Sequence, residues 1–338
     1  MNATATISLP TRISYAIMVV MLVLIGWLHL GTLVLTTLFG FFALQKFSFG
    51  KSKSLGVAIY IVAVVLVGWG LIYVSKRAYT ALPKIAEETI PAMVNYAESR
   101  DIELPFTDYA SAKTLLIAET KEQVASFGVY LKAAAFQIAL LLIGLVVAVS
   151  MFLSGRWGTE ADVQETPDSL YATVVKELAT RVRTFYRSFS RVIGAQIVIS
   201  AINTGLTAVF LVWNGFHYAT TLTALTFICG LLPIIGNIIS NILICGVAFT
   251  VSPRMALIAL IFLIVIHKLE YFLNSKIVGD RIKNPMWLTL LGIVIGEKLM
   301  GIPGMILAPV VLHYIKIEAS KNKITARGVE ASAFVVKD

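Results

Sequence analysis

The sequence predicts an all-α integral membrane protein. Hydrophobic residues make up 58% of the 338, charged residues only 14%, and the mean hydropathy is +0.84. Soluble domains average ~45–50% apolar and ~25% charged residues, so lipid is the expected surrounding of most helices here. Apolar runs alternate with polar segments. Together they predict about eight hydrophobic segments, namely six full spans and two broken or re-entrant helical hairpins, with an extramembrane helical loop.

Six apolar runs have about the length that a helix needs to cross ~30 Å of hydrocarbon. The first two are short and lie close together around His29, which predicts a tight helical hairpin. The six predicted spans are Ile13–Leu28, Leu30–Leu44, Leu55–Val74, Leu131–Leu153, Val192–Trp213 and Met255–Phe272.

Two further apolar runs contain helix breakers near their middle. Phe216–Val251 includes the stretch GLLPIIGNIISN, and Met286–Ile315 includes a block of glycines and prolines. Each half of these runs is short for a crossing, so each run is predicted to be a paired hairpin. Two short spans and a re-entrant dip both fit this pattern.

Charge near the ends of the spans predicts the orientation. Ser75–Tyr130 carries six positive and eight negative residues, whereas the positive residues of Ser154–Arg191 crowd toward the next span. Positive residues favour the cytoplasmic side, so the first segment is expected outside and the second inside, with both termini cytoplasmic. The outer segment is expected to be helical at best in pieces and to shape an entrance or a subunit contact.

Asp168–Arg191 places apolar residues at helical spacing with arginines around them. This pattern fits an amphipathic helix on the inner membrane surface, or a cytoplasmic extension of the next span. The predicted organisation is a hairpin at 1–54, spans with an outer polar loop (75–130) at 55–153, the amphipathic helix at 154–191, a core transport region at 192–315 and a cytoplasmic tail at 316–338.

The first broken run carries candidate substrate contacts. Pro233 lacks a backbone donor, Gly236 permits unusual backbone angles, and Asn237 and Asn241 are four residues apart, which puts both amides on one helix face. Unwound backbone at membrane depth is tolerated only when protein covers it or when it lines a polar cavity. The amides therefore either contact a substrate on a discontinuous helix or cap the break and bond to neighbouring helices.

The second broken run repeats the pattern. Glu297 and Lys298 stand between its two arms, where ionisable groups either serve transport or lie in a water-filled vestibule. Gly292 and Gly296 have the spacing of a helix-packing pair. The candidate path residues of this run are Pro285, Glu297, Lys298, Gly301, Gly304 and Pro309.

Other chemistry finds little support in the sequence. No Asp or Glu occupies the centre of a predicted span, which leaves Glu270, Glu297 and His267, near helix ends, as candidates for ion coupling. The four histidines show no ligand spacing, and no nucleophile or zinc-protease motif occurs, so no metal, no cofactor and no enzymatic activity are expected. The net charge of +9 is dispersed between apolar runs, which argues against nucleic acid binding.

The order of these parts resembles the autoinducer-2 exporter family, the AI-2E family of transporters from bacteria and archaea. The matching pieces are RVIGAQIVISAINTG, LLPIIGNIISNI and LEYFLNSKIVGDRIKNPMWLTLLGIVIGEKLMGIPGMILAPV. The resemblance implies a multi-pass protein of the cell (inner) membrane whose translocation elements lie on the broken segments. Those elements map here onto Pro233, Gly236, Asn237, Asn274, Gly279, Pro285, Gly301, Gly304 and Pro309.

Three functions are compatible with the sequence. The first is export of a small polar molecule, autoinducer-2-like or a related metabolite, along a path lined by the two hairpins. The second is sodium/proton antiport, which the resemblance also allows and which needs a carboxylate at depth. The third is a non-transporting oligomeric scaffold. The expected partners are a small molecule or ion, membrane lipid and further copies of the chain, but not nucleic acid.

Overall fold

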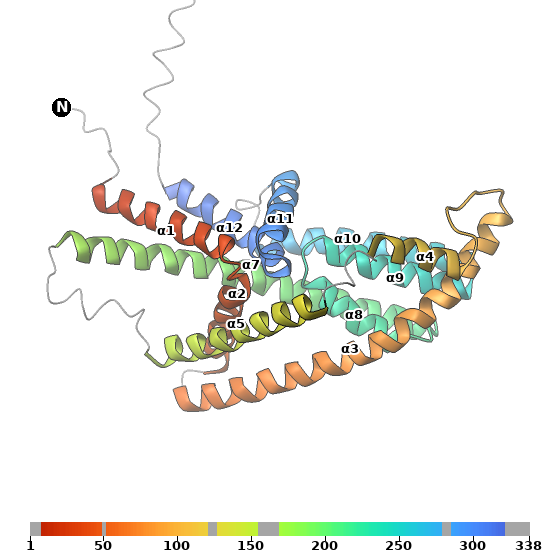
Figure 1. The fold of residues 1–338 in the computed structure, drawn as a ribbon, viewed down its shortest axis with the longest axis horizontal. Coiled ribbons are helices and arrows are strands. Elements are labelled where there is room, and N and C mark those ends of the chain that lie inside the picture. The colour runs from red at the N-terminus through yellow and green to blue at the C-terminus, as the bar shows by residue number, and fades with distance from the viewer. Residues whose placement is uncertain (1–7, 49–51, 121–126, 155–168, 279–284, 322–338) are drawn as a thin grey trace, which may run out of the picture.

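The computed structural model describes residues 8–48, 52–120, 127–154, 169–278 and 285–321, and all the regular secondary structure in these ranges is helical. The helices are α1 (Leu9–Trp27), α2 (Gly31–Phe47), α3 (Lys53–Glu98), α4 (Tyr109–Thr120), α5 (Phe127–Ser154), α7 (Leu170–Trp213), α8 (Ala219–Gly230), α9 (Ile235–Val251), α10 (Pro253–Val278), α11 (Met286–Met300) and α12 (Ile302–Lys321). The prediction of an all-α fold is confirmed (Figure 1).

Six of the described helices are long and apolar enough to cross a membrane, namely α1, α3, α5, α7, α10 and α12. Five of them contain predicted spans. The sixth, α12, takes the place of α2, which has only 17 residues. Large apolar side chains such as Val65, Val146 and Val212 face outward on these helices, which fits contact with hydrocarbon. The chain is a multi-pass membrane protein.

Two long helices join two separate hydrophobic cores. The first core unites α1, α2, α5 and α12 with the first half of α7, around Leu44, Phe189 and Val310. The second unites α8, α9 and α10 with the second halves of α3 and α7, around Leu222 and Ala248. At 1.5 Å per residue, α3 (46 residues) and α7 (44 residues) are roughly 70 and 65 Å long, and each extends along both cores (Figure 1).

The segment after Val74 is helical in pieces, as predicted, but the helix of the predicted span does not end at Val74. Instead of ending there, α3 continues as one helix to Glu98, despite Pro83 and Pro91 in its interior. Packing explains the difference, because Ala81 and Ile85 are buried in the second core. Burial of this apolar face outweighs the low helix propensity of proline.

The segment 170–191 is the beginning of α7 and is continuous with the predicted span Val192–Trp213. Its apolar residues Phe185 and Phe189 are buried against α1, α2 and α12. The Arg181 guanidinium lies over the ring of Tyr15, 3.9 Å from its centroid. The helix bounds therefore support an extension of the span, because the apolar face of this segment packs on protein.

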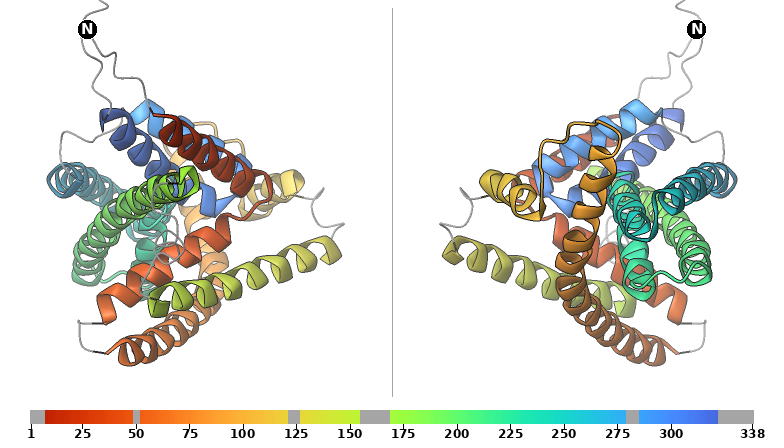
Figure 2. Two further views of the ribbon diagram at one scale, coloured as in Figure 1. Left: turned by 90° about the vertical axis from the view of Figure 1, so that its left-hand side faces the viewer. Right: turned by 90° about the vertical axis from the view of Figure 1, so that its right-hand side faces the viewer.

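α1 and α2 follow each other through a turn at Leu28–Leu30, but they diverge instead of packing as the predicted tight hairpin, because α1 packs on α7 and α2 on α5 (Figure 1). α5 packs along α2, and α3 begins beside them (Figure 2). The hydroxyl of Thr37 donates to the carbonyl of Gly144, on α5. These helices border the second broken hairpin, because Gly31 lies against Met300 and Pro303.

Candidate functional site: a carboxylate held by two amides

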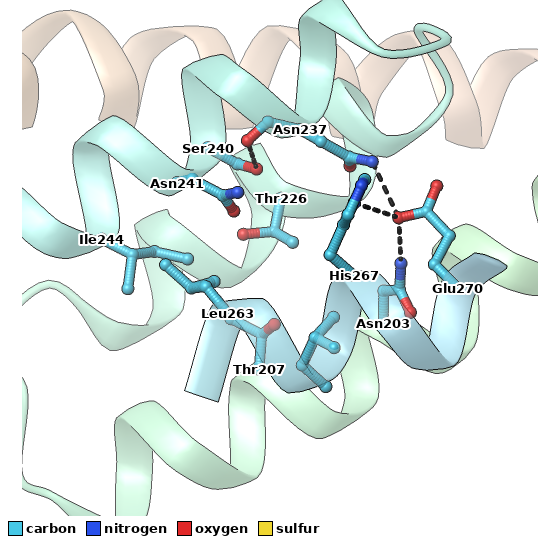
Figure 3. Close-up of a pocket in the computed structure, with 11 residues that line it drawn as sticks. Asn203, Thr207, Thr226, Asn237, Ser240, Asn241, Ile244, Leu263, His267 and Glu270 are labelled. Carbon is cyan, nitrogen blue, oxygen red and sulfur yellow. Dashed lines mark hydrogen bonds and ion pairs between the residues drawn. The ribbon is translucent and has the colours of Figure 1, made fainter. Parts of the chain in front are cut away.

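A small polar pocket lies where α7, α8, α9 and α10 meet (Figure 3). Its volume is about 20 Å³, enough for about one water molecule. The lining residues are Asn203, Thr207, Thr226, Asn237, Ser240, Asn241, Ile244, Leu263, Ile266, His267 and Glu270. Polar side chains thus gather among helices that are otherwise apolar.

One wall of this pocket carries the carboxylate of Glu270, on α10. Its Oε2 atom accepts a hydrogen bond of 2.7 Å from the side-chain amide of Asn237 and one of 3.2 Å from that of Asn203 (Figure 3). His267 Nδ1 lies 4.0 Å from the same oxygen. We call Asn203, Asn237 and Glu270 the amide–carboxylate cluster. It links α7, α9 and α10 through side chains alone.

The cluster leaves hydrogen-bonding capacity unused. Asn203 is 7% exposed, and its Oδ1 atom has no hydrogen-bond partner among the described residues. The hydroxyls of Thr226 and Ser240 donate to nearby backbone carbonyls and keep lone pairs as acceptors. A buried polar atom without a partner calls for a water or a ligand. The pocket can therefore receive a single donor such as a water molecule or a hydroxyl group.

The backbone break before α9 sets the position of Asn237. Ile235 N donates to the Pro233 carbonyl over 2.7 Å, and Ile234 between them has φ 65° and ψ −59°. This is a γ-turn of the rare, strained kind, and a β-branched residue with positive φ is an outlier. The turn starts α9 at Ile235, which puts Asn237 in its first turn, where the helix dipole favours a nearby negative charge such as Glu270.

Gly236 allows the two arms of this hairpin to touch. A Cβ atom added at this glycine would lie 1.7 Å from the Cys229 carbonyl oxygen. No side chain fits there, so glycine permits the close approach of α8 and α9. The Ile234 side chain packs against a small apolar cluster of Ile293, Met305 and Ala308, so the first break contacts the α11–α12 hairpin.

The second break has a different construction. Gly301 has φ 64° and ψ −144°, a conformation open essentially to glycine, and ends α11. A Cβ atom added at Gly304 would lie 1.8 Å from the Gly296 carbonyl oxygen, so α11 and α12 are in backbone contact. This supports the predicted packing role of Gly296. Glu297 and Lys298 form an ion pair of 3.6 Å, with side chains 45% and 80% exposed.

The structure thus gathers only part of the predicted site. Asn237, Asn241, His267 and Glu270 line the polar pocket. The remaining predicted residues are elsewhere. Pro285 caps α11 and Pro309 is inside α12. Glu297 and Lys298 are at the tip of the second broken hairpin. Asn274 is on α10, but its side chain is not described, and Gly279 lies outside the described residues. Within the described part of the chain, no group of His, Cys, Asp and Glu has the arrangement of a metal site.

The sequence also held a signal that the prediction did not use. Asn203 and Thr207 are four residues apart in an apolar span, the same spacing as Asn237 and Asn241. Helical geometry puts each pair on one face, and both faces meet at the pocket. Two amide-bearing faces in separate apolar segments could have suggested that they pair.

An ionisable group inside an apolar helix is expensive and usually serves a function in membrane proteins. Glu270 lies within the candidate span Pro253–Leu273, and its partner Asn237 follows a broken helix, as in many transporters. The fold is that of a multi-pass membrane protein, and the amide–carboxylate cluster is its candidate functional site.

Comparison with known proteins makes the assignment specific. The model of the AI-2E family of transporters matches residues 18–320, and the chain belongs to that family. The chain is also 30% identical, over 151 residues, to a protein of Bacillus subtilis (strain 168) named "Putative transport protein YdbI". The matched stretch spans 43% of that relative and 44% of this chain. Membership of a transporter family fits the expectation that the protein is not an enzyme.

Proposed function

We propose that the protein exports a small polar molecule, autoinducer-2-like or a related metabolite, and that the amide–carboxylate cluster contacts it on the way. The carrying observation is the convergence of Asn203, Asn237 and Glu270 on a pocket with an unpaired buried oxygen. Family membership favours transport over the scaffold alternative. The charges near the span ends favour an orientation with both termini in the cytoplasm. The proposed location is the cell (inner) membrane of a bacterium or archaeon. Assembly with further copies of the chain is part of the same proposal.

The two broken hairpins contribute differently to the proposed path. The first supplies Asn237, Ser240 and Asn241 to the pocket. The second contacts the first through Ile234, so a shift of α11 and α12 would displace the γ-turn at Ile234. Motion of the second hairpin would thereby open or close the pocket, which holds only about one water molecule in this conformation.

The direct test compares the metabolites released by cells with and without the protein, with autoinducer-2 among those measured. Wild-type protein is expected to raise the outside amount of at least one small polar compound. Asn237→Leu is expected to preserve assembly and to reduce that release about tenfold, because a substrate hydrogen bond is lost. Asn95→Leu makes the same change at an exposed position of α3 and serves as the matched control. Normal release by Asn237→Leu would refute the contact.

Cation/proton antiport is the second candidate, and Glu270 is the observation that favours it. Its carboxylate lies within a candidate span and has His267 4.0 Å away, so it can exchange a proton for a cation. Inside-out vesicles containing a pH-sensitive dye would report a sodium-driven proton flux. Unchanged flux after combined Glu270→Gln and Glu297→Gln substitution would exclude antiport through these carboxylates.

A further inference from the structure

A second cavity, far larger than the polar pocket, lies between the α1–α2 hairpin and the α11–α12 hairpin. Its volume is about 560 Å³, and α5 and α7 close its other sides. Aliphatic, aromatic and methionine side chains and glycines form nearly all of its lining. Thr37 and Tyr186 supply its side-chain hydroxyls, and each donates a hydrogen bond, to the Gly144 carbonyl and to Gln45 Oε1.

Water is a poor occupant of this cavity. An ordered water needs about two to four polar partners, and apolar cavities of ~150 Å³ stay dry. Here both hydroxyls already donate within the protein. Protein interiors contain few voids larger than a water molecule, because lining atoms without neighbours lose their dispersion contacts. An apolar occupant is therefore needed.

The cavity reaches the outer surface of the helices. Met21 on α1 and Ile295 and Leu299 on α11 line it, and these side chains are 41%, 49% and 45% exposed. α1 and α11 approach each other at Gly26, where an added Cβ atom would lie 3.7 Å from Leu299 Cδ1. The surrounding surface is the apolar one that hydrocarbon covers. An occupant can thus enter from the bilayer without crossing water.

We propose that this cavity binds an acyl chain of a membrane lipid. The competing occupant is a helix from a second copy, and the cross-linking measurement described below distinguishes it from lipid. A single flexible hydrocarbon chain can follow the space between the two hairpins. The acyl chain is surrounded by hydrocarbon in the bilayer and by apolar side chains in the cavity, so its transfer gains little from the hydrophobic effect. Filling of the void and dispersion contacts with the lining residues therefore favour binding.

The bound chain joins two elements that touch little otherwise. On one side it contacts α1 and α2 near Met18 and Phe41, and on the other it contacts α11 and α12 near Gly296 and Gly304. The hydrocarbon thus takes the place of side chains between the first hairpin and the second broken hairpin. The site is independent of the amide–carboxylate cluster, which belongs to α7, α9 and α10.

Photolabelling of the full chain in phosphatidylcholine vesicles tests the proposal. A fraction of the lipid carries a diazirine in one acyl chain, and mass spectrometry maps the adducts after irradiation. Met18 and Phe41 are only 6% and 7% exposed, so adducts there report a chain inside the cavity. We expect such adducts in the unmodified protein. Adducts confined to outward-facing positions such as Val65 and Val146 would overturn the proposal.

A pair of neighbouring residues on α5 provides the matched variants. Val147 lines the cavity, whereas Val146 is 69% exposed on the outer face. Val147→Phe is expected to reduce the adducts at Met18 and Phe41 about fivefold or more, because the ring occupies the space of the chain. Val146→Phe should label like the unmodified protein. Equal labelling of both variants, with both folded, would contradict the site.

A second measurement uses only the unmodified sequence, in case Val147→Phe does not fold. A photoreactive methionine analogue incorporated in place of methionine is expected to cross-link to phospholipid at Met18, seen as a lipid-mass adduct that fragmentation of the α1 peptide assigns to Met18 and not to the 41%-exposed Met21. A cross-link from this position to a peptide of a second copy, without a lipid adduct, would show that another chain fills the cavity. That result would overturn the proposal.

Discussion

The two broken hairpins look alike in sequence and differ in what they build. Both interrupt an apolar run with proline and glycine, and in both a glycine is in contact with a backbone carbonyl of the opposite arm. The α8–α9 hairpin places Asn237 against Glu270 in a polar pocket. The α11–α12 hairpin instead lines an apolar cavity, and its ionisable pair is exposed at the tip. In both hairpins the helix break lies beside a pocket or cavity, and the neighbouring side chains determine whether that space is polar or apolar.

The largest expected effect is on the feature that the hairpins share. Gly236→Ala and Gly304→Ala would each put a methyl group inside contact distance of a carbonyl oxygen. We expect each to reduce stability by roughly 3 kcal/mol or more, measured as thermal unfolding of the purified protein. Gly205→Ala on α7 is the control, because nothing lies within 4 Å of the added methyl group. Normal melting of Gly236→Ala would contradict the tight turn.

A smaller effect is expected where the hairpins meet. Ile234→Ala removes the side chain that packs on Ile293 and Met305 and should reduce stability by about 1–3 kcal/mol. The Ile238 side chain, on α9, is 54% exposed, and Ile238→Ala should change the stability by less than about 0.5 kcal/mol. Comparison of the two melting temperatures isolates the contact. Equal losses would show that Ile234 does not join the hairpins.

The smallest expected effect lies at the beginning of α8, in the first broken hairpin. The Tyr218 hydroxyl donates to Glu88 Oε1 over 2.8 Å, and this hydrogen bond raises the pKa of Tyr218. Since the folded-state pKa is raised, the stabilisation is present below about pH 10 and is lost as pH rises through the higher folded value. Tyr218→Phe should cost about 0.5–1 kcal/mol at pH 8 and remove this alkaline dependence from the unfolding curve. A variant curve that retains the dependence would rule out this origin.

The sequence predicted the helical class, the two breaks and two of the three residues of the amide–carboxylate cluster. Asn237 and Glu270 were both singled out, but for separate roles, because their contact depends on how α9 and α10 pack. Asn203 went unused for the same reason. The continuation of α3 beyond Val74 was also missed, since its polar residues suggest a loop and only the burial of Ala81 and Ile85 makes the helix favourable. Local pattern gives the elements, and tertiary packing selects which faces meet.

The cavity between the hairpins lay beyond sequence reasoning for a related reason. Its lining residues are ordinary apolar residues of several helices, and nothing distinguishes Val147 from Val146 in the sequence. Only the arrangement of α1, α2, α5, α7, α11 and α12 leaves the space unfilled. No residue type or spacing in the sequence indicates such a cavity.

The central claim is that transport depends on the carboxylate of Glu270, which lines the polar pocket, and not on the carboxylate of Glu297, at the tip of the α11–α12 hairpin. The most direct measurement compares Glu270→Gln with Glu297→Gln in vesicles, using the compound whose release depends on the wild-type protein. We predict that Glu270→Gln lowers the initial rate about tenfold or more, with Glu297→Gln close to wild type. Equal rates in the two variants, or a larger loss in Glu297→Gln, would contradict the account.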